Sequence, residues 1–149
     1  MIGGCRALLA ALALVGCAPL TFSHDPAVDF EHYRSVCVAP VSSAVHAGYA
    51  DVYLARQLAE SSGFEHVTLA EGRCDLILDV EISVHQEITV DDDGDTDVDY
   101  SAVASFVAIT PGGRVVDAGS VDATSESSLE AVEDALDWVA HHYLRPYRA

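Results

Sequence analysis

The stretch Asp75–Val90, DLILDVEISVHQEITV, alternates apolar and polar residues over sixteen positions. The even positions from Leu76 to Val90 are apolar except Gln86, and the odd positions are mostly polar. A period of two predicts a β-strand with one face toward a core and the other toward water. At about 3.3 Å per residue the strand would span about 50 Å, so it must twist, bulge or project beyond the core.

The residues after this stretch predict the returning strand of a hairpin. Asp91–Asp97 forms the turn, and Val98–Thr110 is the returning strand. Placing Val90 opposite Val98, and hence Ile82 opposite Phe106, puts apolar residues opposite apolar residues on one face. A two-residue Asp93-Gly94 turn would mix the faces, so the pattern predicts a wider loop centred on Gly94.

The remaining elements follow from periodicity and from turn residues. They are a strand over Tyr33–Pro40, a helix over Tyr49–Ser62, a brief edge strand over His66–Leu69, and a strand over Val115–Ala123. A closing helix starts at the capping box Ser127-Ser128-Leu129-Glu130 and ends by Pro146. The order β-α-(β)-β-β-β-α predicts an α+β fold, mainly an antiparallel meander with two helices packed on one face.

The N-terminal residues have the layout of a secretory signal peptide, with Arg6 before the apolar run Ala7–Val15. That run is about half the ~20 residues that a membrane-spanning helix needs. Leu14-Val15-Gly16-Cys17 resembles the lipobox of bacterial lipoproteins. The resemblance implies cleavage before Cys17 and acyl chains on Cys17, which would anchor the protein in a membrane. Ala18 after the cysteine, rather than Asp, points by the same resemblance to the outer membrane facing the periplasm.

These assignments divide the chain into three parts and leave one domain. Residues 1–16 are the signal peptide, residues 17–29 a lipidated tether, and residues 30–149 the domain. The whole chain has no lysine and a formal net charge of −17. Such a surface repels nucleic acid and anionic lipid headgroups, so binding of nucleic acid is not expected.

Two cysteines remain in the domain, Cys37 and Cys74. An exported protein folds in an oxidising compartment, where a disulfide between them would form. The alternative is two separate buried thiols.

The acidic run from Asp91 to Asp99 suggests a calcium loop through Asp91, Asp93, Asp95 and Asp97. The EF-hand spacing fails, because aligning Gly94 with the invariant glycine puts Tyr100 where the bidentate Glu belongs. A solvated hairpin tip, whose charges discourage edge pairing, is the favoured interpretation.

No set of residues predicts catalysis. The sequence contains no Gly-x-Ser-x-Gly, no His-Glu-x-x-His and no phosphate loop. His141 and His142 are adjacent, so on a helix they point about 100° apart and do not form a metal pair. We therefore expect no enzyme, and no cofactor other than the acyl chains on Cys17.

Three short motifs carry a second resemblance. They are Phe30-Glu31-His32-Tyr33, the helix end Leu58 to Phe64, and the strand start Cys74-Asp75-Leu76-Ile77-Leu78. Together they are similar to a bacterial envelope-lipoprotein domain family of unknown function. More distantly, the chain resembles the lipoproteins of lipopolysaccharide export, curli secretion and penicillin-binding-protein activation.

The second resemblance implies a role but transfers no functional residue to this sequence. The role is that of a non-enzymatic accessory domain that docks on an envelope protein complex. The alternative is a ligand-binding lipoprotein that holds a divalent cation at the acidic hairpin or a small apolar molecule.

Overall fold

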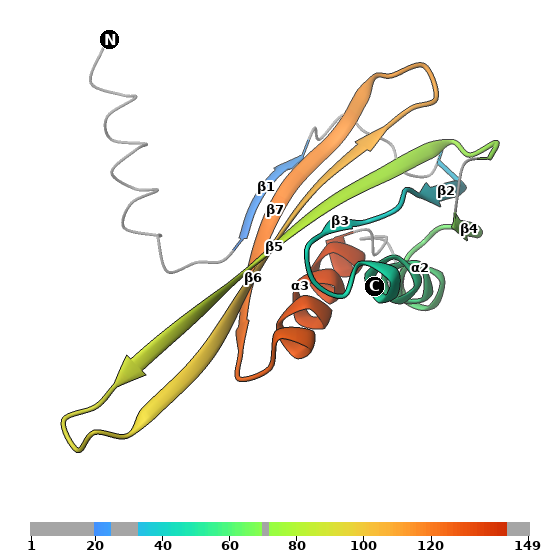
Figure 1. The fold of residues 1–149 in the computed structure, drawn as a ribbon. Coiled ribbons are helices and arrows are strands. Elements are labelled where there is room, and N and C mark those ends of the chain that lie inside the picture. The colour runs from blue at the N-terminus through green and yellow to red at the C-terminus, as the bar shows by residue number, and fades with distance from the viewer. Residues whose placement is uncertain (1–19, 25–32, 70–71, 143–149) are drawn as a thin grey trace, which may run out of the picture.

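The long alternating stretch forms strand β5, Leu76–Val90, inside a seven-stranded sheet of order β1-β7-β6-β5-β2-β4, with β3 paired to β5. The computed structural model describes residues 20–24, 33–69 and 72–142 (Figure 1). The other strands are β1 Leu20–His24, β2 Ser35–Val38, β3 Ser42–Ser43, β4 His66–Leu69, β6 Thr96–Ile109 and β7 Val115–Ser125. The helices are α2 Ala47–Ser61 and α3 Ser128–His142.

The predicted α+β class and the order of elements over the domain are confirmed, and both helices lie on one side of the sheet (Figure 1). The meander is β5-β6-β7, with antiparallel pairing throughout. The sheet is mixed, however, because β2 runs parallel to both β4 and β5, and β3 runs parallel to β5. Helix α2 supplies the crossover that a parallel β2–β4 pair needs.

Strand β1 lies inside the segment that the sequence assigned to a tether. Leu20–His24 pairs antiparallel with β7, and Leu20 lies opposite Val121. The tether prediction rested on missing periodicity. A five-residue edge strand shows little periodicity, and its backbone hydrogen bonds come from β7. The rest of the predicted tether, residues 17–19 and 25–29, lies outside the described residues.

The hairpin register differs from the predicted one by two residues. Ile88 lies opposite Val98, Val84 opposite Ala102, and Val90 opposite Thr96. Apolar residues still meet on one face, because a shift of two preserves the alternation. The alternation fixes the register only to the nearest two residues, and the turn decides the rest. Here the loop is five residues long, Asp91–Asp95, instead of seven.

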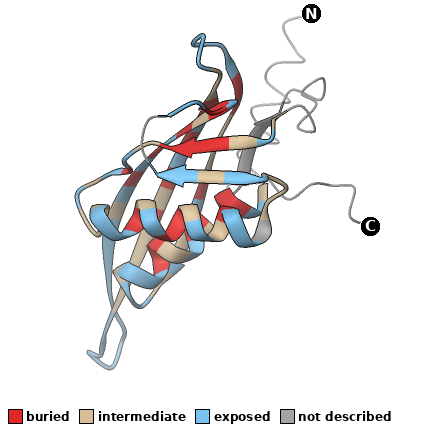
Figure 2. Cartoon of the chain, turned by 90° about the vertical axis from the view of Figure 1, so that its right-hand side faces the viewer, coloured by how far each residue is buried: buried red, intermediate tan, exposed pale blue. Residues whose placement is uncertain are grey.

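The core lies between this sheet and the two helices (Figure 2). Leu76, Leu78, Val80 and Ile82 of β5 are buried as their even numbering predicts. Strand β6 presents Ala102, Ala104 and Ala108, and α3 presents Ala131 and Ala135, all at most 1% exposed. Small side chains on both surfaces let α3 pack closely on the sheet. Neither described helix is long and apolar enough to cross a bilayer.

The capping box of α3 forms in part. The Glu130 amide donates to the Ser127 hydroxyl at 3.5 Å, and the Ala131 amide donates to the Ser127 carbonyl at 3.0 Å. The Glu130 carboxylate accepts a hydrogen bond from the Ser125 hydroxyl at 2.7 Å. In a complete capping box it would instead accept one from the Ser127 amide. Glu130 therefore ties the end of β7 to the start of α3.

Candidate docking surface: the β5–β6 arm

Beyond Tyr100 the β5–β6 hairpin leaves the rest of the sheet and continues as a two-stranded ribbon. Ser125, the last residue of β7, pairs with Tyr100, so residues of β6 before Tyr100 pair only with β5. We call residues 86–100 the arm, and it projects to the lower left in Figure 1. A two-stranded hairpin is at best marginally stable in water, so contact with another surface would stabilise the arm.

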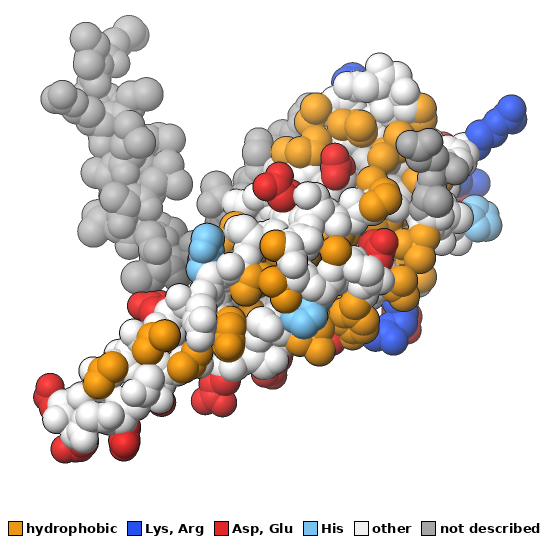
Figure 3. Space-filling view, viewed as in Figure 1, with side chains coloured by type: hydrophobic (Ala, Val, Ile, Leu, Met, Phe, Trp, Pro, Cys, Tyr) orange, Lys and Arg blue, Asp and Glu red, His pale blue; other side chains and the backbone are white. Residues whose placement is uncertain are grey.

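One face of the arm is apolar and exposed. Ile88 and Val90 are 61% and 63% exposed, and Val98 lies directly opposite Ile88. These residues share the face that carries the buried core residues closer to the helices. Figure 3 shows hydrophobic side chains along the arm. The arm thus carries an apolar face that no described element covers.

The tip and the other face of the arm are acidic. Six aspartates lie in this segment: Asp91, Asp92, Asp93, Asp95, Asp97 and Asp99. Glu87 lies directly opposite Asp99, and such a like-charge pair destabilises a hairpin. Acidic side chains mark the tip in Figure 3. A cationic partner surface would relieve this repulsion.

The turn at the tip is organised by Asp91. Its Oδ1 accepts the amides of Asp93 at 3.0 Å and Asp95 at 2.8 Å, and its own amide donates to the Asp95 carbonyl at 3.0 Å. Gly94 has a φ of 86°, which a glycine adopts without strain. Of the calcium candidates, Asp91, Asp93 and Asp95 lie in this turn, and Asp97 lies on β6. Among the described residues, no three His, Cys, Asp or Glu side chains form a group that could hold a metal ion.

The opposite end of the sheet carries three exposed arginines, Arg34, Arg73 and Arg114. Arg34 lies just before β2, Arg73 just before β5, and Arg114 in the turn between β6 and β7. All three are therefore at the end of the sheet where β5 starts and β6 ends. Arg114 Nη2 donates to the Tyr33 hydroxyl at 3.1 Å, and Arg34 Nε lies 4.0 Å from Glu65 Oε1. We call this region the arginine end.

Cys37 and Cys74 form a disulfide next to the arginine end, with Cα atoms 5.7 Å apart. It joins the middle of β2 to the residues before β5, and both cysteines are buried. The Thr68 hydroxyl of β4 lies 3.3 Å from the Cys37 sulfur and 3.4 Å from the Cys74 sulfur. The bond therefore fastens the three-stranded edge of the sheet.

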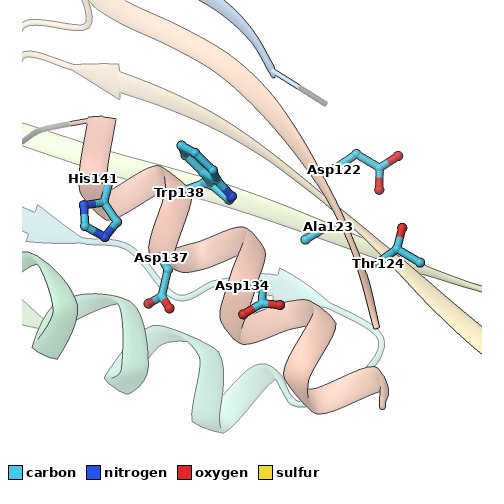
Figure 4. Close-up of a pocket in the computed structure, with 7 residues that line it drawn as sticks. All are labelled: Asp122, Ala123, Thr124, Asp134, Asp137, Trp138 and His141. Atoms are coloured by element: carbon cyan, nitrogen blue, oxygen red, sulfur yellow. The ribbon is translucent and has the colours of Figure 1, made fainter. Parts of the chain in front are cut away.

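A groove of about 560 Å³ runs between α3 and the end of β7 (Figure 4). Trp138, 47% exposed, lies in it together with Asp134 and His141 of the same helix. Burial raises the pKa of Asp134, and the neighbouring carboxylates Glu130, Asp137 and Glu133 raise it further.

Two other acids of the groove already have partners. Asp137 accepts from the Tyr53 hydroxyl at 2.9 Å, and Asp122 accepts from the Ser101 hydroxyl at 2.6 Å. In Figure 4, Asp122 points away from the helix. The acids of the groove do not converge on one point, so the arm is the stronger candidate for a binding surface.

The structure adds a buried polar pair that the sequence analysis missed. Asp117 of β7 is 3% exposed, and its Oδ2 lies 2.6 Å from Nε2 of His142 at the end of α3. Asp117 lies opposite Ala108 in the same register that puts Val121 opposite Ala104, so its side chain is on the core face of β7. The sequence signal was that Asp117 falls in the same alternation as the apolar Val121 and Ala123 of the last strand, whereas Asp122 does not.

Other polar contacts also hold elements together. His46 Nε2 lies 3.1 Å from the Ser128 hydroxyl, which joins the loop before α2 to the start of α3. The Tyr49 hydroxyl donates to Glu133 Oε1 at 2.6 Å and so links the two helices. That hydrogen bond raises the pKa of Tyr49. The lipobox and Cys17 lie outside the described residues.

This chain is similar in fold to several solved structures. No protein-family model matches the sequence, and no curated protein matches it. The PelC dodecamer from Paraburkholderia phytofirmans has a TM-score of 0.63 and 17% identity, over 85% of this chain and 98% of that chain. A PDZ domain protein from Parabacteroides distasonis has a TM-score of 0.54 and 13% identity, over 88% of this chain and 36% of that chain. A minor lipoprotein from Acinetobacter baumannii has a TM-score of 0.49 and 12% identity, over 74% of this chain and 89% of that chain.

Proposed function

We propose that this chain is a lipid-anchored protein of the bacterial cell envelope that works as a non-enzymatic docking domain for an envelope protein complex. The observation that carries this proposal is the arm. It combines exposed Ile88 and Val90 with a row of acids on a ribbon that extends beyond the core. Exposed apolar residues rimmed by polar ones are typical of protein interaction sites.

In this proposal, acyl chains on Cys17 anchor the protein in the membrane. Ala18 after the cysteine indicates the outer membrane. Leu20, three residues after Cys17, pairs with Val121 in the sheet. Three residues span at most about 10 Å, so acyl chains on Cys17 would hold the domain directly at the membrane. A flexible tether over residues 17–29 would have allowed the domain to lie much farther from the membrane.

The non-enzymatic part of the proposal rests on how the polar side chains are used. Tyr53 bonds Asp137, Asp117 bonds His142, and Tyr49 bonds Glu133. These contacts join α2 to α3 and α3 to β7, so they stabilise the fold. The similarity to a subunit of the PelC dodecamer favours a role in a multi-subunit assembly, since that protein is built from many copies of such a domain.

The anchor is tested by fractionating cells that express the full chain. We expect the wild type in the membrane fraction and Cys17→Ser in the soluble fraction. Cys5→Ser is the matched control, because Cys5 lies in the segment that cleavage would remove, and it should fractionate like the wild type. A Cys17→Ser protein that stays with the membrane would contradict lipid anchoring.

Docking is tested by photo-crosslinking in cells. A photoreactive residue at Ile88 should give a covalent protein adduct, because the arm lies against a partner. The control position is Val52, which is 51% exposed on α2, and it should give at most a minor adduct. If Ile88 gives no adduct, or the same adducts as Val52, the arm is not a docking surface.

A further inference from the structure

We infer that the arm of one copy docks on the arginine end of a second copy of this chain, head to tail. This inference rests on the proposed docking function and names the partner. The arm is residues 86–100, and the arginine end comprises Arg34, Arg73 and Arg114 together with the exposed apolar residues beside them.

The charges of the arm and of the arginine end are complementary. The arm holds six aspartates, and three of the four arginines in the described chain lie at the arginine end, exposed. The chain has no lysine, so this end is the main concentration of fixed positive charge among the described residues, although Glu65 and Asp75 lie beside Arg34 there. Opposite charges across an interface favour the correct pairing and suppress wrong ones.

The two surfaces cannot meet within one molecule. Strand β5 has the arginine end before its first residue, Leu76, and the tip after its last residue, Val90. Fifteen residues of strand separate the two ends by about 50 Å. The complement of the arm therefore lies on another molecule.

The arginine end also carries exposed apolar residues. Val115, next to Arg114, is 59% exposed, and Leu69 is 44% exposed. Leu69 and Arg73 line the same hollow beside the disulfide. These side chains could cover Ile88 and Val90 of the arm while the aspartates meet the arginines.

Charge also selects the orientation of the two copies. A symmetric arm-to-arm contact would bring twelve aspartates together, whereas a head-to-tail contact pairs each arm with arginines. The net charge of −17 opposes association at long range, but at physiological salt charges are screened over about 8 Å, so local pairing dominates. A head-to-tail contact that repeats produces a ring or a filament.

The experiment uses the full chain in mild detergent and two charge-reversed variants. The arm variant is Asp92→Arg with Asp93→Arg, which leaves the turn residue Asp91 intact. The end variant is Arg73→Asp with Arg114→Asp. The control is Arg56→Asp on α2. Thermal unfolding first checks that every variant is folded, and analytical ultracentrifugation then measures assembly.

The inference predicts that the wild type and Arg56→Asp form multimers. Each charge-reversed variant alone should assemble at least about tenfold more weakly. A one-to-one mixture of the two variants should assemble again, because the reversed arm of one then matches the reversed end of the other. Such mutual rescue requires contact between these two surfaces on different molecules.

Three results would overturn the inference: a monomeric wild type, folded variants that assemble like the wild type, or a mixture that fails to assemble. The photo-crosslink at Ile88 separates this failure from failure of the proposed function. An adduct with a different protein, together with a monomeric wild type, would leave docking in place and remove the second copy as the partner.

Discussion

The two halves of the β5–β6 hairpin have the same alternating sequence and opposite environments. Near the helices, Val80 and Ile82 are 0% and 4% exposed, whereas Ile88 and Val90 in the arm are 61% and 63% exposed. All four lie on the same face of the same strand. Alternation therefore shows which face is apolar, but it does not show what covers that face.

The difference follows from the lengths of the elements. Helix α3, of fifteen residues, packs mainly on β6 and β7, and β6 has fourteen residues, but the helix is about 22 Å long and β6 about 46 Å. A helix packed along the strand leaves more than half of it uncovered. Four matched changes test this contrast, from the largest expected effect to the smallest.

Ile82→Ala and Ile88→Ala compare the two halves directly. Ile82→Ala should lower the free energy of unfolding by about 4 kcal/mol, because it leaves a cavity in the core. Ile88→Ala should change it by less than about 0.5 kcal/mol, since the side chain is already in water. Urea unfolding of both variants measures this, and similar losses would show that the arm is packed against something in the isolated protein.

Removing the disulfide should destabilise the part of the sheet that the helices cover and leave the hydrogen-exchange protection of the arm unchanged. Loss of the Cys37–Cys74 bond should cost roughly 3–4 kcal/mol, because it frees a loop of 37 residues in the unfolded chain. Urea unfolding with and without reductant measures the loss, and hydrogen exchange should show unchanged protection in the arm. Full alkylation of both cysteines without reductant would show that the bond is absent.

Asp117→Ala and Asp93→Ala compare a buried aspartate with an exposed one. Asp117→Ala should cost about 2–3 kcal/mol, because the His142 ring, whose side chain is 11% exposed, loses its carboxylate partner. Asp93→Ala should have little effect, or stabilise slightly by lowering the repulsion at the tip. Thermal unfolding separates the two, and an Asp117→Ala protein as stable as the wild type would contradict a structural role for the pair.

Asp75 supplies the smallest effect, and it depends on pH. The amides of Arg34 and Ser35 donate to its carboxylate at 2.8 and 3.1 Å, and the first of these contributes most to lowering the pKa of Asp75 below its ordinary value of 3.8. The unfolded chain therefore binds the proton more tightly than the folded one. The stabilisation is fully present above about pH 4 and is lost as the pH falls through the folded pKa.

Asp75→Asn should remove that dependence. We expect the wild type to be more stable than the variant at pH 6, and the gap to shrink by pH 3. The matched control is Asp92→Asn in the arm, which should show no such gap. A constant difference between wild type and Asp75→Asn across this range would contradict the prediction.

Much of the fold could be predicted from local pattern. Strand β4 was predicted with its observed bounds, and β5, β7 and both helices within a few residues of theirs. The hairpin register was wrong by two, because the alternation repeats every two residues and the length of the turn, which the Asp91 hydrogen bonds organise, selects among the allowed pairings. Strand β1 was missed, because an edge strand of five residues is specified by its neighbour β7.

The sequence by itself determined the alternating faces of β5 and β6, the acidic tip, and the spacing of elements, because these depend on residues near one another in the chain. Only the tertiary structure decided where the apolar face loses its cover, which end of the sheet gathers Arg34, Arg73 and Arg114, and that Asp117 meets His142. Those features depend on contacts between distant segments, which the local pattern does not encode. The candidate docking surface is therefore a product of both: its chemistry is written in the sequence, and its exposure results from a helix shorter than the strand it covers.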